Sequence, residues 1–152
     1  MKGIQIRTAF TMIELIFVIV ILGILAAVAL PKFLGVKEQA HNSMAIAFAG
    51  TMTRTVGHTF WADSMLGGHD GTIRYDSNRT KFEGKSLSYY VDHYPFMLDE
   101  TTINFDNCII GNGLANPFMQ HKVGYNYNIF CRDGNKTDAP KFVASENDKY
   151  TF

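Results

Sequence analysis

The stretch FTMIELIFVIVILGILAAVALP, residues 10–31, is a long apolar run near the start of this 152-residue chain. No charged residue lies between Leu15 and Leu30. A helix over residues 10–30 would be about 31 Å long, which matches the hydrocarbon core of a bilayer. An acid, Glu14, lies near the start of the run, and Pro31 follows its end. Because a lone carboxylate in a membrane is costly, Glu14 is a candidate functional residue.

Two interpretations treat the run as an ordinary membrane-targeting segment. It could be a secretory signal cut after Ala29, because residues 27–29 read Ala-Val-Ala. Pro31 would then be the second residue after the cut, and Glu14 would interrupt the apolar core of the signal. Alternatively, the run could be an uncleaved anchor in which Glu14 only favours the helix dipole.

In a third interpretation, the chain is cut between Ala9 and Phe10. The new amine of Phe10 and the carboxylate of Glu14 would then lie one helical turn apart, with opposite charges at a similar depth. The amine that pairs with Glu14 could belong to the same chain or to a neighbouring copy. Lys2 and Arg7 precede the run and favour a cytoplasmic N-terminus.

The N-terminal segment as a whole resembles a known family. A short basic leader, a small residue, FTMIEL and an apolar run with Gly23 and Pro31 resemble the type IV pilins and type II secretion pseudopilins, over about residues 2–50. The resemblance implies cleavage before Phe10 by a prepilin peptidase, which also N-methylates Phe10. It implies a helix bend at Gly23 and Pro31. Ala9 departs from the glycine that is usual in the family.

The resemblance also implies a function. The chain would be a structural subunit, not an enzyme: a pseudopilin of a type II secretion-like or DNA-uptake apparatus, polymerised through its N-terminal helix. The alternative within the family is a type IV pilus pilin with roles in adhesion, motility or transformation. The alternative from another class is an exported soluble periplasmic binding domain or enzyme, cut after Ala29.

Partners and location follow from the same resemblance. The expected partners are further copies of the chain, other pilin-like subunits, the prepilin peptidase, an inner-membrane assembly platform and membrane lipid. The expected location is the bacterial inner membrane, crossed once, with the C-terminal domain in the periplasm. A true pilin would instead end in a cell-surface filament.

We expect four parts along the chain: a cleaved leader (1–9), a transmembrane and polymerisation helix (10–31), an amphipathic continuation (32–66) and a β-rich globular part (67–152). The continuation is predicted from apolar residues at a spacing of three and then four, a helical stripe expected to pack on the globular part. Gly67-Gly68 marks its latest end. The stripe consists of Phe33, Val36, Ala40, Met44, Phe48, Met52, Val56 and Phe60.

The globular part is predicted to contain a small antiparallel sheet packed on the helix, which gives an α+β, pilin-like fold. Runs rich in β-branched and aromatic residues are separated by turn signals such as Gly111-Asn112-Gly113 and Asn116-Pro117. The predicted strands are Ser86–Val91, Thr102–Ile110, Val123–Cys131 and Lys141–Ala144.

The two cysteines, Cys108 and Cys131, predict a disulfide if this region is exported. The bridge would close a loop of about 24 residues and contribute roughly 3 kcal/mol to stability. The alternative is a pair of free core thiols. No C-x₂-C spacing points to zinc.

An oxygen-rich cluster near the C-terminus is a candidate calcium site. Related pseudopilins commonly bind calcium in a C-terminal loop, and Asp133, Asn135, Thr137 and Asp138 offer the oxygen ligands that calcium requires. The glycine and bidentate glutamate of an EF-hand loop are missing, so the alternative is a polar turn. No other cofactor is expected.

Two segments share the pattern D-x-N-x-T, residues 76–80 and 133–137. Each contains an N-x-T acceptor, which makes Asn78 and Asn135 candidate N-glycosylation sites. The preceding acid resembles the longer acceptor motif that some bacteria use. The alternative is two ordinary turns, because Asp and Asn are common turn residues.

Catalytic and DNA-binding patterns are weak. The five histidines are scattered, and neither His69-Asp70 nor Asp92-His93 belongs to a recognised motif. Cys131 lacks a recognisable partner arrangement for a nucleophile. DNA binding is an uncertain further option, carried by a modest basic stretch that Asp76 and Glu83 oppose, in a chain of zero net charge. The stretch consists of Arg74, Arg79, Lys81 and Lys85.

Overall fold

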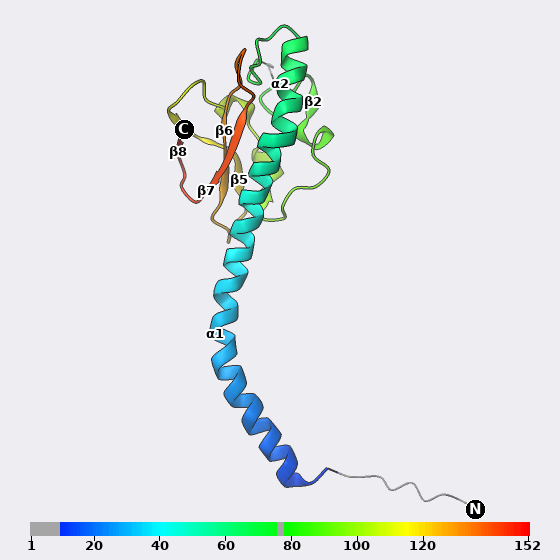
Figure 1. The fold of residues 1–152 in the computed structure, drawn as a ribbon, viewed down its shortest axis with the longest axis vertical. Coiled ribbons are helices and arrows are strands. Elements are labelled where there is room, and N and C mark those ends of the chain that lie inside the picture. The colour runs from blue at the N-terminus through cyan, green and yellow to red at the C-terminus, as the bar shows by residue number, and fades with distance from the viewer. Residues whose placement is uncertain (1–9, 76–77) are drawn as a thin grey trace, which may run out of the picture. The chain divides into compact units, whose positions relative to one another are not determined.

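The computed structural model describes residues 10–75 and 78–152 and divides into two units, Met1–Gln39 and Ala40–Phe152. Helical structure runs through α1 (Met12–Thr51), a short π-helix η1 (Met52–Val56) and α2 (Gly57–Leu66) (Figure 1). Pro31 lies inside α1, and the helix continues on both sides of it.

Both ends of this helical stretch have local causes. At the start, the Thr11 hydroxyl accepts a hydrogen bond from the Glu14 backbone N–H at 3.4 Å, and the Thr11 carbonyl accepts from the same N–H at 3.1 Å. At the other end, α2 stops at Leu66, where the Gly67 N–H donates to the Asp63 carbonyl. Gly68 then takes a φ of 78°, a left-handed conformation that glycine adopts without steric cost.

The unit Ala40–Phe152 contains a four-stranded antiparallel sheet in the order β3-β5-β6-β7 (Figure 1). Two strand pairs accompany it, β1 with β2 and β4 with β8. These features confirm the predicted α+β, pilin-like class, a long N-terminal helix packed on small antiparallel sheets. The strands are β1 (Lys81–Phe82), β2 (Lys85–Ser86), β3 (Leu98–Asp99), β4 (Leu114–Ala115), β5 (Pro117–His121), β6 (Asn128–Arg132), β7 (Lys141–Ser145) and β8 (Tyr150–Thr151).

The hydrophobic core lies between the helix and the sheet. Phe60 of α2 is fully buried, and its ring meets Phe82, Tyr90 and Phe105 edge-on at centroid distances of 4.9, 4.6 and 5.6 Å. Edge-to-face contacts are a favoured aromatic geometry. Other members of the core are Met52, Val56, Ile73, Leu87, Met97, Leu98, Phe118, Met119, Ile129 and Phe142.

Within the unit Ala40–Phe152, the predicted helical stripe was wrong in part. Met52, Val56 and Phe60 are buried as expected, but Met44 is 50% exposed. Ahead of Met52 the buried positions are instead Ala45 and Ala49. Their small side chains let the helix backbone lie against the domain. The larger neighbours Met44 and Phe48 flank this contact, Met44 exposed and Phe48 half-buried.

The strand predictions failed where side chains bind the local backbone. Thr102–Ile110 does not form a strand, because it contains the 3₁₀ helix η4 (Phe105–Asn107) and the end of η3 (Glu100–Thr102). The Asn104 side chain accepts from the Asp106 N–H at 2.9 Å and so caps η4. Such bonds compete with strand pairing. The predicted strand Ser86–Val91 likewise contains the 3₁₀ helix η2 (Leu87–Tyr89).

The remaining strand predictions were better. Lys141–Ala144 is confirmed as β7, and only the second part of Val123–Cys131 forms β6. Gly124 has a φ of 91°, so the chain turns there. Strand β5 was missed because Asn116-Pro117 was interpreted as a turn. Pro117 is the first residue of β5, a strand position that tolerates proline.

Thr53 of η1 binds the edge of the sheet that is formed by β7. Its hydroxyl donates to the Phe142 carbonyl at 2.9 Å and accepts from the Phe142 N–H at 2.8 Å. Because β7 is an edge strand, these backbone groups would otherwise lack a strand partner. Gly57 permits the approach, since a Cβ there would lie 2.8 Å from the Pro140 carbonyl oxygen.

We therefore expect Thr53→Val to lower the free energy of unfolding by about 1–3 kcal/mol, because it leaves the partly buried Phe142 N–H unpaired while keeping the side chain's shape. Denaturant unfolding of the detergent-solubilised chain measures the loss. Thr53→Ser, which keeps the hydroxyl, should retain most of the stability. Thr59→Val, at an exposed threonine that bonds the Thr55 carbonyl, is the matched control. Equal losses at positions 53 and 59 would contradict the role of Thr53.

Candidate functional site

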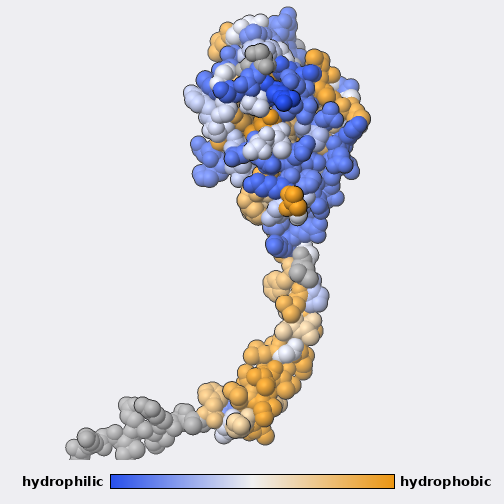
Figure 2. Space-filling view, turned by 180° about the vertical axis from the view of Figure 1, so that it is seen from behind, coloured by the Kyte–Doolittle hydropathy of each residue, from blue (hydrophilic) through white to orange (hydrophobic). Residues whose placement is uncertain are grey.

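The surface of the N-terminal helix is the candidate functional site. Large hydrophobic side chains from Phe10 to Leu30 are between 43% and 81% exposed. Figure 2 shows hydrophobic residues covering this helix, whereas the visible face of the unit Ala40–Phe152 is largely hydrophilic. Within the described residues, one helix, Met12–Leu66, is long enough and apolar enough to cross a membrane. An 18-residue window of this helix has a mean hydropathy of 3.0. These features fit a membrane-anchored protein.

Glu14 lies in the first turn of this helix, next to its cap. Thr11, Met12, Ile13 and Glu14 form the pattern T-x-x-E, and the Thr11 hydroxyl accepts from the Glu14 N–H as in a capping box. The sequence already contained this signal, but the interpretation of Glu14 considered only the helix dipole and an ammonium partner. A capping role needs Glu or Gln, whereas pairing with an ammonium needs the negative charge.

The other residues predicted for processing and bending stay predictions. Ala9, on one side of the expected cut, lies outside the described residues, as does Asp76 of the first D-x-N-x-T segment. Pro31 lacks a backbone N–H, so α1 loses one hydrogen bond there. A Cβ at Gly23 would meet nothing within 4 Å, so packing within the chain does not require glycine at this position.

A buried carboxylate, Asp133, joins two loops of the globular unit. It is only 4% exposed, and its oxygens accept from the Ile73 N–H and the Gly134 N–H, both at 2.8 Å, and from the Thr72 hydroxyl. Burial raises the pKa of Asp133, and the three hydrogen bonds oppose that rise. The Ser64 hydroxyl of α2 donates to the Thr72 carbonyl at 2.7 Å, which ties the same loop to the helix.

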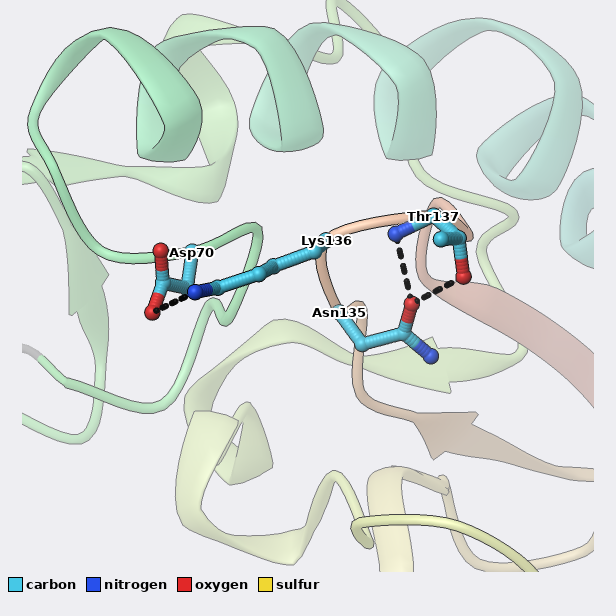
Figure 3. A network of polar contacts seen from close by, with 4 residues as sticks. All are labelled: Asp70, Asn135, Lys136 and Thr137. Carbon is cyan, nitrogen blue, oxygen red and sulfur yellow. Dashed lines mark hydrogen bonds and ion pairs between the residues drawn. The ribbon is translucent and has the colours of Figure 1, made fainter.

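The two loops also meet at Asn135. The Trp61 Nε1–H donates to the Asn135 carbonyl at 2.7 Å, and the Lys136 ammonium lies 3.3 Å from the Asp70 carboxylate (Figure 3). Gly71 has a φ of 83°, and a Cβ there would overlap the Asn135 carbonyl oxygen. We call this contact between residues 67–73 and residues 133–138 the loop junction.

Calcium binding in the second loop stays a prediction. The Asp133 oxygens already accept three hydrogen bonds within the loop junction. Asn135 and Asp138 bond each other, the Asp138 N–H donating to the Asn135 side-chain oxygen at 2.9 Å. Among residues 10–75 and 78–152, no group of three or more His, Cys, Asp or Glu side chains is arranged to hold a metal ion.

Cys108 and Cys131 form a disulfide in the structure, and both are fully buried. Backbone bonds reinforce it: the Ile109 N–H donates to the Cys131 carbonyl at 3.1 Å, and the Asp133 N–H donates to the Ile109 carbonyl at 2.7 Å. The bridge therefore fastens the segment before β4 to strand β6. Cys131 was considered as a nucleophile, but its sulfur is bonded to Cys108 and so carries no free thiol.

The weaker catalytic and DNA-binding candidates mostly contact neighbours in the fold. His69 stacks on the Tyr75 ring, with centroids 3.4 Å apart, and Asp70 pairs with Lys136. The Lys85 ammonium lies over the Tyr89 ring at 4.5 Å, a cation–π contact. DNA binding by the basic stretch that contains Lys85 stays a prediction.

Comparison with known proteins gives one partial match. Type II secretion system core protein G of Vibrio cholerae serotype O1 is 46% identical to this chain over 46 residues, which is 30% of this chain and 32% of that protein. The chain thus spans about a third of the length of the curated relative it matches. No family model matches, and no solved structure matches. For part of the chain, the match supports the resemblance drawn from the sequence.

The loop junction makes a prediction about stability. Asp133→Ala should lower the free energy of unfolding by about 1–3 kcal/mol, because it leaves the buried N–H groups of Ile73 and Gly134 without their acceptor. Asp148→Ala, at an exposed acid, is the matched control and should change stability by less than about 0.5 kcal/mol. Denaturant unfolding of both variants measures the difference. If the two were equally stable, Asp133 would not hold the loops together.

Proposed function

We propose that this chain is a structural subunit of a type IV filament, a pseudopilin of a type II secretion-like or DNA-uptake apparatus. One observation carries the proposal: the apolar side chains of residues 10–30 are unburied by their own chain, and an acid lies in the first turn of their helix. The partial match to a type II secretion system core protein supports it.

In this proposal, a prepilin peptidase cuts between Ala9 and Phe10 and N-methylates the new terminus. The cut supplies the cation that Glu14 lacks in lipid. Before assembly, residues 10–31 hold the subunit in the inner membrane, with residues 67–152 in the periplasm and residues 32–66 joining the two. An inner-membrane platform then adds subunits, in which the Phe10 amine of one copy pairs with Glu14 of another. Because an unpaired charge in an apolar surrounding is costly, the pairing favours correct axial register.

A type IV pilus pilin is the second candidate. The buried disulfide between Cys108 and Cys131 favours it, because a covalent link suits a domain exposed outside the cell. Both candidates share processing, anchoring and polymerisation, and they differ in the machine that the filament serves. A deletion mutant separates them: loss of secretion or DNA uptake supports the pseudopilin, and loss of surface pili supports the pilin.

Variants of Glu14 separate its charge from its capping role. Glu14→Gln keeps a residue that is compatible with the capping box but removes the charge, whereas Glu14→Val removes both. We expect both variants to insert in the membrane and both to lose most filament assembly. Leaving a docked ammonium unpaired costs about 3–5 kcal/mol. Glu14→Asp, which keeps the charge, should retain more assembly than Glu14→Gln.

Membrane fractionation measures insertion, and immunoblots of sheared filaments with electron microscopy measure assembly. Assembly of Glu14→Gln at the wild-type level, with a defect only in Glu14→Val, would assign Glu14 to helix capping and contradict charge pairing. Wild-type assembly of both variants would contradict any assembly role of Glu14.

A further inference from the structure

The turn before strand β4 contains an Asn-Gly pair, Asn112-Gly113. Asn112 is the one asparagine of the chain that a glycine follows. The pair lies between η4 and β4, outside the described helices and strands, and Asn112 is exposed. Because glycine has no Cβ, its backbone nitrogen is little hindered and its backbone is unusually mobile. A nitrogen in this position can therefore reach the side-chain carbonyl carbon of the asparagine before it.

No described residue restrains the approach of these two groups. Among residues 10–75 and 78–152, none forms a hydrogen bond with the Asn112 side chain or with the Gly113 N–H. Gly111, on the other side of Asn112, has a φ of 74°, which glycine adopts without steric cost. The Gly113 carbonyl accepts from the Phe152 N–H at 3.1 Å, so the turn is fastened only beyond the reacting nitrogen.

Other asparagines are restrained in ways that Asn112 is not. The Asn107 side-chain nitrogen donates to the Pro117 carbonyl at 2.6 Å. Asn116 precedes Pro117, which has no backbone N–H to lose. Asn42 lies within α1, where helical hydrogen bonds fix the backbone nitrogen that follows it. Sequence and structure thus single out the same asparagine.

The Asp-Gly pair of the loop junction shows the opposite case. The Gly134 N–H donates to Asp133 Oδ1 at 2.8 Å, and the Ile73 N–H donates to the same oxygen at 2.8 Å. Both residues of this pair are buried. These bonds hold the carboxylate with an oxygen, and not its carbon, toward the glycine nitrogen. A glycine after an acid or amide is therefore not sufficient, because the local fold must also leave the side chain unrestrained.

We propose that Asn112 is a site of spontaneous deamidation in the folded protein, through a cyclic imide formed with Gly113. The Gly113 nitrogen loses its proton to solvent base and bonds to the Asn112 side-chain carbonyl carbon. The bond from that carbon to the side-chain nitrogen breaks, and this nitrogen takes up a proton and leaves as ammonia. Water then opens the five-membered imide. Opening at the side-chain carbon gives aspartate, and opening at the main-chain carbon gives isoaspartate.

The reaction changes both the charge and the path of this turn. Either product replaces a neutral amide by a carboxylate, in a turn where Ile110 and Leu114 expose apolar side chains. Isoaspartate also lengthens the main chain by one carbon. The added carbon lies between Ile109, which pairs with Arg132, and strand β4, which pairs with β8. The modification therefore alters a surface turn and leaves the buried core residues unchanged.

The test incubates the purified full-length chain in detergent and mildly alkaline buffer, and peptide mass spectrometry follows each asparagine. We expect Asn112 to convert at least about tenfold faster than Asn135, a difference of about 1.4 kcal/mol in the barrier. The rate should rise with pH, because the attacking nitrogen must lose its proton. An isoaspartyl methyltransferase with its methyl donor should label the peptide that contains residue 112, which distinguishes imide formation from direct hydrolysis of the amide.

Two variants test the assigned atoms. Gly113→Ala hinders the attacking nitrogen and should slow the reaction at least about tenfold. The fold accommodates this change, because a Cβ at Gly113 would meet only the Ile109 side chain, at 3.9 Å. Asn112→Gln keeps the amide but lengthens the side chain by one methylene, so the five-membered ring cannot form. This variant should show no isoaspartyl label at position 112.

A peptide of residues 109–116 gives the rate without the fold. The folded chain should react within about tenfold of this peptide, because no described residue restrains the turn. A folded chain that reacts far more slowly than the peptide would overturn the proposal. Equal rates in the wild type and Gly113→Ala, or at Asn112 and Asn135, would also overturn it. Because the reaction needs only purified protein and water, its outcome is independent of filament assembly.

Discussion

The N-terminal helix has an apolar surface that its own chain does not bury. The large hydrophobic side chains between Phe10 and Leu30 are all exposed. Burying one such side chain stabilises a protein by about 1.5–3 kcal/mol, so covering this surface with an apolar environment such as lipid is favourable. The unit Ala40–Phe152 needs no such cover for its core, because Phe60, Phe118 and Ile129 are fully buried within it. The large unburied apolar surface therefore belongs to the N-terminal helix and not to the core of the globular unit.

In the proposed filament, the charge of Glu14 gives the contact between helices its specificity. Apolar surfaces alone attract one another without fixing an axial position, whereas a charge in a medium of low dielectric strongly favours one position of its partner. The cap formed by Thr11 sets where the helix begins, and so where Glu14 lies along it. Capping and charge pairing are thus compatible roles of one residue at one end of one helix.

Local patterns in the sequence predicted the features that depend on near neighbours. The apolar run, the helix end next to Gly67, the strand from Lys141 and the overall α+β class could all be predicted in this way. The capping box of Thr11 and Glu14 could also have been predicted from the sequence, but it was not. The strand predicted at Thr102–Ile110 is absent, and the Asn104 side chain there accepts a hydrogen bond from the nearby backbone instead.

Contacts between distant residues could not be predicted in this way. Trp61 and Asn135 lie 74 positions apart, and Thr53 and Phe142 lie 89 apart. No periodicity encodes such pairs, so the sequence could not show that Asp133 faces inward. Its candidate role as a calcium ligand came from residue types alone, and the structure adds the donors that surround it.

The most direct measurement is the N-terminus of the mature protein, recovered from membranes of the native host and determined by mass spectrometry of its first peptide. If cleavage creates the cation that pairs with Glu14, the mature chain begins at Phe10 and carries a methyl group on its amine. A chain that begins at Leu30 would have lost the apolar helix and Glu14 with it. That result would contradict membrane anchoring and polymerisation through this helix.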